Sequence, residues 1–103
     1  MDAETRTAMN GSIEIWERRA KGEDISVGYR NCPLCMIFHG IPRRERGENV
    51  IGCDGCPVAE RTGMRYCDKT PYVDFVDIPE TETKARMAAA KREVEFLKSL
   101  VPE

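Results

Sequence analysis

The chain has 103 residues, which is enough for one domain with a modest core. Sixteen basic and eighteen acidic side chains give a formal net charge of −2, so the composition argues against a general nucleic-acid binder. No apolar run approaches the roughly 18–20 residues of a membrane span, and the first four residues lack the basic-then-apolar order of a signal peptide. We therefore expect a cytoplasmic protein with no membrane partner.

The first part of the chain, residues 1–27, is predicted to be a helical arm. Its apolar residues recur at intervals of four, three and four, and so share one helix face. These residues are Met9, Ile13, Trp16 and Ala20. Gly11 weakens the first turn, so the helix is predicted from Ser12 to Lys21. Trp16 is expected in the core.

The central segment, residues 28–69, contains all five cysteines. Two short apolar runs, 36–39 and 49–52, predict the strands of a β-hairpin around a polar loop. Pro57 and Gly63 then predict the start and the end of a short helix. The order of turn, hairpin, turn and helix is typical of a treble-clef zinc finger. The helix would begin at Cys56, and its N-terminal dipole is expected to lower the pKa of that thiol.

The last part of the chain, residues 70–103, is also predicted to be helical. Thr70-Pro71 is typical of a helix start, and Ile78-Pro79 ends this short helix. Residues 81–100 are rich in strong helix formers. The apolar residues of this second helix recur like heptad a and d positions. They are Met87, Ala90, Val94, Leu97 and Val101.

These elements predict a single α+β domain in which a metal-binding module lies between two helical arms. The C-terminal helix is expected to pack on the N-terminal one. The predicted core between them is Ile13, Trp16, Val94, Phe96 and Leu97. Binding of a partner, or homodimerisation through the C-terminal helix, is the alternative use of its apolar stripe.

The spacing of the cysteines is the strongest chemical signal. Cys32 and Cys35 form one C-x2-C pair, Cys53 and Cys56 form another, and seventeen residues separate the pairs. This spacing is typical of zinc sites. Thiolates are soft donors, and four of them close a tetrahedral shell around a structural zinc ion. An odd number of cysteines in a cytoplasmic chain argues against a disulfide framework. We predict a zinc site at these four residues.

The ligand set and the metal both have alternatives. Cys67 could replace Cys53 or Cys56 as the fourth ligand, or it could be a small buried residue. His39 is a less favoured ligand and could instead donate a hydrogen bond to a thiolate. An iron–sulfur cluster is the alternative to zinc, because Cys32 and Cys56 each precede a proline, as occurs at cluster sites. A closed four-thiolate shell leaves no position for a reactive water, so we predict no enzymatic activity.

Arg43, Arg44 and Arg46 form the densest basic cluster, in the polar loop between the predicted strands. Three arginines at a hairpin tip could contact phosphates. A zinc-finger nucleic-acid binder is therefore an alternative function. Glutamates interleave with these arginines, which favours the simpler interpretation of a solvated loop.

Several motifs resemble those of a group of small cysteine-rich proteins of bacteriophages and prophages. They are Cys32-Pro-Leu-Cys35, Cys53-x-Gly-Cys56-Pro-Val58, Thr62-Gly63, Cys67, Thr70-Pro-Tyr72, Ser12-Ile13 with Trp16, and Glu95-Phe-Leu-x-Ser-Leu100. The resemblance implies an accessory role in the host-cell cytoplasm, directed at host or defence machinery. It also favours Cys67 as a ligand. We thus expect a non-enzymatic protein that acts through a protein partner. A nucleic-acid binder and an iron–sulfur protein for electron transfer or sensing are the alternatives.

Overall fold

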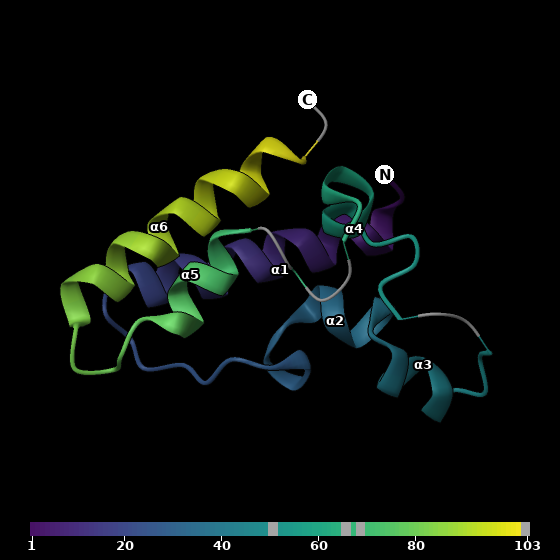
Figure 1. Cartoon of the computed structure of the whole chain (residues 1–103). Coiled ribbons are helices and arrows are strands. Elements are labelled where there is room, and N and C mark those ends of the chain that lie inside the picture. Colours follow the sequence, from purple (N-terminus) through teal and green to yellow (C-terminus); the bar gives the residue numbers. More distant parts are fainter. Residues whose placement is uncertain (50–51, 65–66, 68–69, 102–103) are drawn as a thin grey trace.

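The computed structural model describes residues 1–49, 52–64, 67 and 70–101, and within these ranges it contains helices and no strand (Figure 1). The elements, in chain order, are α1 (Ala3–Ala20), the 3-10 helix η1 (Tyr29–Asn31), α2 (Pro33–Phe38), α3 (Gly40–Glu45), α4 (Pro57–Thr62), α5 (Pro71–Asp77) and α6 (Thr83–Ser99). No described helix combines the length and apolar character that a membrane span requires.

Helix α1 begins nine residues earlier than the sequence predicts. The Asp2 side chain caps it by accepting a hydrogen bond of 2.7 Å from the Thr5 backbone N–H. The helix runs through Gly11 without a break. A Cβ atom at Gly11 would lie 3.1 Å from Cγ of Pro33, so the glycine allows α2 to approach α1 closely. Tertiary packing thus explains a residue that helix propensity alone disfavours.

The predicted β-hairpin is wrong, and with it the α+β class and the treble-clef arrangement. Residues 36–38 belong to α2, and the predicted polar loop forms α3. Of the second predicted strand, residues 50 and 51 lie outside the described ranges, and its first and last residues lie in no helix or strand. Pro33 occupies the first turn of α2, where its fixed φ favours a helix. A four-residue apolar run does not by itself distinguish strand from helix.

The other predicted helices are confirmed with small changes at their ends. Helix α4 begins at Pro57 and ends before Gly63, whose φ of 73° is typical of a helix C-terminus. Thr70 caps α5 by accepting a hydrogen bond of 3.2 Å from the Tyr72 N–H. Helix α6 is shorter than the predicted range by two residues at its start and one at its end.

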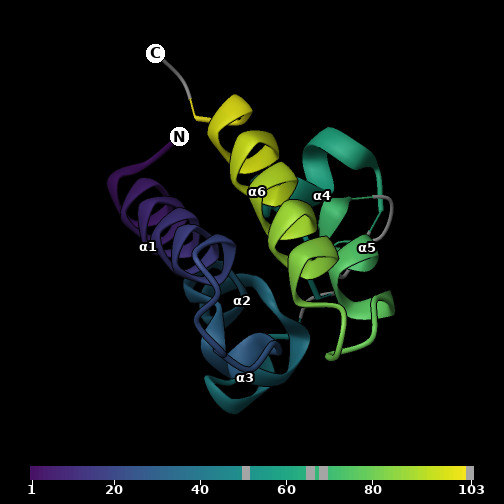
Figure 2. The same cartoon turned by 90° about the vertical axis from the view of Figure 1, so that its left-hand side faces the viewer.

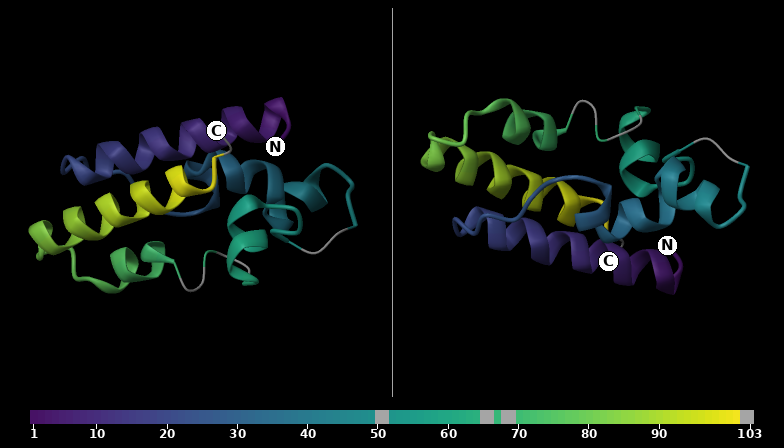
Figure 3. Two further views of the ribbon diagram at one scale, coloured as in Figure 1. Left: turned by 90° about the horizontal axis from the view of Figure 1, so that it is seen from above. Right: turned by 90° about the horizontal axis from the view of Figure 1, so that it is seen from below.

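Helices α1 and α6 run antiparallel along each other, and α6 lies between α1 and α5 (Figure 2). Of the predicted core, four residues are buried and Phe96 is partly buried against it. The buried four are Ile13, Trp16, Val94 and Leu97. The apolar stripe of α6 therefore packs within the chain, as the prediction of packing against the N-terminal helix requires. Helices α2, α3 and α4 lie beside the N-terminal half of α1 and the C-terminal half of α6 (Figure 3).

Candidate metal centre

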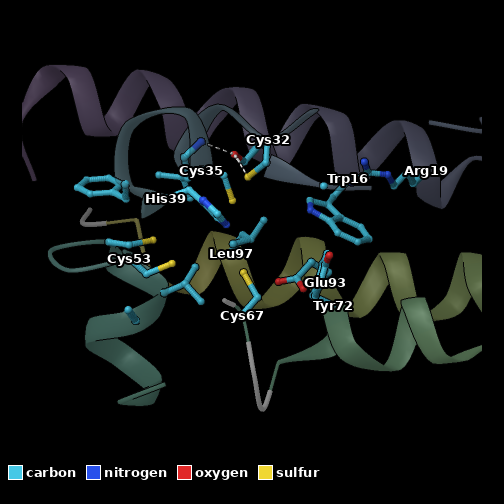
Figure 4. Close-up of a pocket in the computed structure, with 17 residues that line it drawn as sticks. Trp16, Arg19, Cys32, Cys35, His39, Cys53, Cys67, Tyr72, Glu93 and Leu97 are labelled. Carbon is cyan, nitrogen blue, oxygen red and sulfur yellow. Dashed lines mark hydrogen bonds between the residues drawn. The ribbon is translucent and has the colours of Figure 1, made fainter. Parts of the chain in front are cut away.

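All five cysteines line one cavity of about 300 Å³ between α1, α2, α4 and α6 (Figure 4). We call it the cysteine cavity. Its sulfur-bearing residues are Cys32, Cys35, Cys53, Cys56 and Cys67. His39 also lines it, and most of the remaining wall is formed by aromatic and aliphatic side chains. The fold thus brings thiols from three separate segments, up to thirty-five residues apart, to a single place.

Cys32 and Cys35 come from the start and the first turn of α2. Cys32 is the N-cap residue, and its Sγ lies 3.6 Å from the Ser12 hydroxyl oxygen of α1. The same hydroxyl accepts a hydrogen bond of 3.4 Å from the Leu34 N–H. The Cys35 thiol donates to Cys32, which lowers the pKa of Cys32 to about 6 despite its burial. The same hydrogen bond, together with burial, raises the pKa of Cys35. One thiol of the pair is thus poised to ionise first.

Cys53 and Cys56 occupy a tight turn that leads into α4. Cys53 has a φ of 67°, and its N–H donates a hydrogen bond of 2.6 Å to the Phe38 carbonyl at the end of α2. This bond joins the two cysteine segments. Cys56 is the N-cap residue of α4. Burial raises the pKa of Cys56, and it outweighs the hydrogen bonds that the thiolate would accept from the Val58 and Ala59 N–H groups. The expected lowering of this pKa by the helix is therefore wrong.

Cys67 approaches the cavity from the side opposite Cys32 and Cys35 (Figure 4). Its φ is 62°, and its carbonyl accepts a hydrogen bond of 2.6 Å from the Thr70 hydroxyl, which fixes it next to the start of α5. Burial raises the pKa of the Cys67 thiol. Cys67 thus lines the same cavity as the other four cysteines, and it is partly buried, as Cys32 and Cys35 are.

His39 also points into the cavity (Figure 4). It is the N-cap residue of α3, and its Nδ1 accepts a hydrogen bond of 3.2 Å from the Ile41 N–H. This bond fixes the orientation of the ring by a local interaction. The imidazole adds a sixth nitrogen or sulfur donor to the cavity.

The donors surround the cavity without converging on one point. In a tetrahedral zinc site with Zn–S distances of about 2.3 Å, neighbouring sulfurs lie about 3.8 Å apart. Within the part of the chain that the structure describes, no three His, Cys, Asp or Glu side chains lie close enough together to hold one ion. Figure 4 shows Leu97 pointing between Cys35 and Cys67. The donor chemistry fits a thiophilic metal, although no three of the donors are gathered around one point in the described residues.

The cavity also contains a buried carboxyl group that the sequence analysis did not single out. Glu93 of α6 is 2% exposed, and it accepts a hydrogen bond of 3.5 Å from the Thr70 hydroxyl. Burial raises its pKa to about 7. Glu93 follows Ala90 by three residues and so continues the apolar stripe of α6. A charged residue within an apolar stripe is the sequence signal that could have identified Glu93 as a buried carboxyl group.

Arg19 is a buried charged residue on α1, as Glu93 is on α6, and it lies three positions after Trp16. It is 4% exposed, and its guanidinium lies 4.4 Å from the centre of the Trp16 ring. The guanidinium donates hydrogen bonds of 3.0 and 2.7 Å to the carbonyls of Ile25 and Ser26. Arg19 therefore fixes the segment that leaves α1, at the edge of the cysteine cavity.

The predicted arginine cluster lies on α3 and in the turn that follows it. Arg43 donates a hydrogen bond of 2.9 Å to the Asp54 carbonyl in the second cysteine turn. Arg46 donates hydrogen bonds of 2.8 and 2.7 Å to the carbonyls of Met36 and Ile37, which are exposed acceptors at the end of α2. Arg44 is exposed. Arg43 and Arg46, two of the three arginines predicted to contact phosphates, thus donate hydrogen bonds within the chain and support the cysteine segments.

Comparison of the chain with family models, with curated proteins and with solved structures finds no match. Function is therefore inferred from the cavity and its residues.

Proposed function

We propose that this chain is a non-enzymatic interaction protein whose central segment is fixed by a thiolate-bound metal centre. The observation that supports the proposal is that all five cysteines line one cavity. The spacing of Cys32, Cys35, Cys53 and Cys56 favours zinc, with Cys67 as the alternative fourth ligand. An accessory role in the host-cell cytoplasm, as the resemblance to phage proteins implies, belongs to the same proposal.

A metal centre would supply stability that the central segment lacks. Among its described residues, Leu34, Pro42 and Val58 are the buried apolar side chains other than cysteines. So small a core stabilises a segment of this length only marginally. A metal ion bound by thiolates from α2, the second cysteine turn and Cys67 would cross-link these pieces, and its binding free energy would add to the free energy of folding.

The surface around this centre would serve as the contact area. Met36 of α2 and Ile41 of α3 are 44% and 37% exposed, and Arg44, three residues after Ile41 on α3, is exposed as well. Exposed apolar side chains together with arginine are the residue types that protein interfaces favour. Arg43 and Arg46 already donate hydrogen bonds to backbone carbonyls. The phosphate-binding alternative depended on these two arginines and on Arg44, so the structure supports it less well.

Native mass spectrometry of the protein purified without chelator tests the metal centre. We expect a mass excess that corresponds to bound metal and is lost on denaturation. Cys35→Ser and Cys56→Ser should each lower the bound metal several-fold, because each removes a donor from the cavity. Met36→Ser is the matched control, since Met36 is exposed on the same helix as Cys35. A metal-free wild type whose thermal unfolding is insensitive to chelator would contradict the proposal.

Affinity capture from host lysate, with and without nuclease, tests the kind of partner. We expect a protein partner that remains bound after nuclease treatment and is weakened by Ile41→Asp. Loss of all captured material on nuclease treatment, with retention that falls steeply as salt is added, would indicate nucleic-acid binding instead.

A further inference from the structure

The Cys32 and Cys35 thiols are in direct contact with each other. The Cys35 thiol donates a hydrogen bond to Cys32, and both side chains line the cysteine cavity (Figure 4). The Met36 N–H donates a hydrogen bond of 3.0 Å to the Cys32 carbonyl, so one closed helical turn holds the two residues. Residues three apart on such a turn have Cβ atoms about 5–6 Å apart, and a disulfide needs about 3.5–4.5 Å. A small shift at the N-cap would therefore join the two sulfurs.

The first cysteine pair is also easier to reach from solution than the second. Cys32 and Cys35 are partly buried, and the cavity that they line is partly open to solvent. Cys53 and Cys56 are each 7% exposed and belong to the buried core. Cys67 is partly buried, but it lies on the opposite side of the cavity from Cys32 (Figure 4). A thiol-specific reagent should thus react with the first pair before the second.

Ser12 of α1 supports one thiol of this pair. It is 2% exposed, and its hydroxyl oxygen lies 3.6 Å from the Cys32 sulfur. That oxygen accepts a hydrogen bond of 3.4 Å from the Leu34 N–H, which leaves the hydroxyl proton available to Cys32. A hydrogen bond donated to a sulfur favours negative charge on it, and the thiolate is the nucleophile in thiol–disulfide exchange. Cys32 is therefore the sulfur that attacks first.

From these observations we propose that Cys32 and Cys35 form a reversible redox pair, which exchanges with a low-molecular-weight disulfide such as glutathione disulfide. Disulfides in a reducing compartment are usually transient and serve catalysis or redox sensing. The proposal goes beyond the metal centre. The reduced pair offers two thiolate donors to a metal and the oxidised pair offers none, so oxidation would also release a metal that these two residues hold.

The exchange has two steps. The Cys32 thiolate attacks one sulfur of glutathione disulfide, which forms a mixed disulfide at Cys32 and releases one glutathione thiolate. The Cys35 thiolate then attacks the Cys32 sulfur, which breaks the mixed disulfide and releases the second glutathione. The protein loses two electrons and two protons, and the two glutathione molecules gain both. The reverse sequence, with glutathione as reductant, restores the two thiols.

Equilibration of the protein with glutathione tests the pair. The full chain, reduced and freed of bound metal with a chelator, is equilibrated without oxygen in mixtures of reduced and oxidised glutathione. The remaining thiols are then alkylated and located by mass spectrometry. We expect a disulfide between Cys32 and Cys35 that forms and disappears as the mixture is varied. At the mixture that oxidises half of this pair, Cys53 and Cys56 should be at least about tenfold less oxidised.

Single variants test the order of attack. Cys35→Ser retains Cys32 and should accumulate protein with one added glutathione, because the second step cannot occur. Cys32→Ser should add glutathione at Cys35 at least about tenfold more slowly than Cys35→Ser adds it at Cys32. Met36→Ser, at an exposed position on α2, should exchange as the wild type does. The helical circular dichroism of each variant separates loss of a reactive thiol from loss of the fold.

Two results of the wild-type titration would overturn the proposal. One is a Cys32–Cys35 pair that stays reduced, or that takes up glutathione without forming the internal disulfide. The other is oxidation of Cys53 and Cys56 before the first pair. Because the titration uses metal-free protein, either result would leave the proposed metal centre standing. Conversely, a chain that binds no metal would still confirm the redox pair by forming this disulfide.

Discussion

Glu93 places a carboxyl group where a negative charge is costly. It is 2% exposed, and burial raises its pKa from 4.5 to about 7. The unfolded chain loses this proton above about pH 4.5, whereas the folded protein retains it up to about pH 7. The free energy of unfolding of the metal-free protein should therefore fall as pH rises through this window, by at most about 3 kcal/mol.

Glu93→Gln tests this prediction, because glutamine preserves the shape and does not ionise. Urea unfolding of the metal-free proteins should give a shallower pH dependence for the variant than for the wild type, and a more stable variant at neutral pH. The Cys32 thiol titrates in the same range, so the difference between the two proteins isolates Glu93. Glu95→Gln is the exposed control on the same helix. Equal slopes for Glu93→Gln and the wild type would refute the assignment.

At the scale of residues, the sequence predicts which side chains have the chemistry of the site better than it predicts the surroundings of each side chain. Cys32 and Cys56 carry the same chemistry in a C-x2-C pair, yet hydrogen bonding lowers the pKa of Cys32 whereas burial raises that of Cys56. The partners of Arg46 are backbone carbonyls of another helix. Burial and carbonyl partners arise from tertiary structure, and no spacing rule contains them.

At the scale of elements, α6 packs into the core through a face that includes small side chains. Ala90 is fully buried on the face of α6 that packs in the core. Ala90→Leu should destabilise the protein by about 1–3 kcal/mol, because extra methyl groups in a packed interface force strain. Ala88→Leu is the matched control, since Ala88 is exposed two residues away. Thermal unfolding measures both. Equal melting temperatures for the two variants would show that the interface is loosely packed.

The long helices could be predicted because each carries an apolar stripe over several turns. The stripes of α1 and α6 contain Trp16 and Leu97, and both are buried as expected. The short helices α2 and α3 could not be predicted in the same way. A run of four apolar residues fits either period, and Pro33 was the local signal for a helix. Gly11 was misleading, since its role is to accommodate Pro33.

At the scale of the whole molecule, the sequence predicts which residues form the candidate site and leaves its dimensions undetermined. The two C-x2-C pairs indicate a thiolate centre, and the fold brings both pairs to the cysteine cavity. The volume of the cavity depends on how α1, α2, α4 and α6 pack. Glu93 and Leu97 reach it from a helix sixty residues beyond the first pair.

The molecule therefore combines two regions with different sources of stability. Helices α1, α5 and α6 share an apolar core, in which Trp16 packs edge-on against Phe75 with ring centres 5.1 Å apart. In the segment from Cys32 to Gly63, most of the apolar side chains that reach this core are only partly buried, as Ile37, Phe38 and Ala59 are. If the segment binds a metal as we propose, removal of the metal should loosen it first, because metal binding would then supply much of its folding free energy.

Hydrogen exchange measured by mass spectrometry tests this order. After chelation, amides of α2, α3 and α4 should exchange at least about tenfold faster, a loss of about 1.4 kcal/mol of local stability. Amides in the middle of α1 and α6 should change little, since their protection derives from the apolar core. Met36→Ser, which leaves the thiols intact, should show the same response to chelation as the wild type. A uniform rise along the whole chain would mean that the metal supports the fold globally, and no change would mean that it supports none of it.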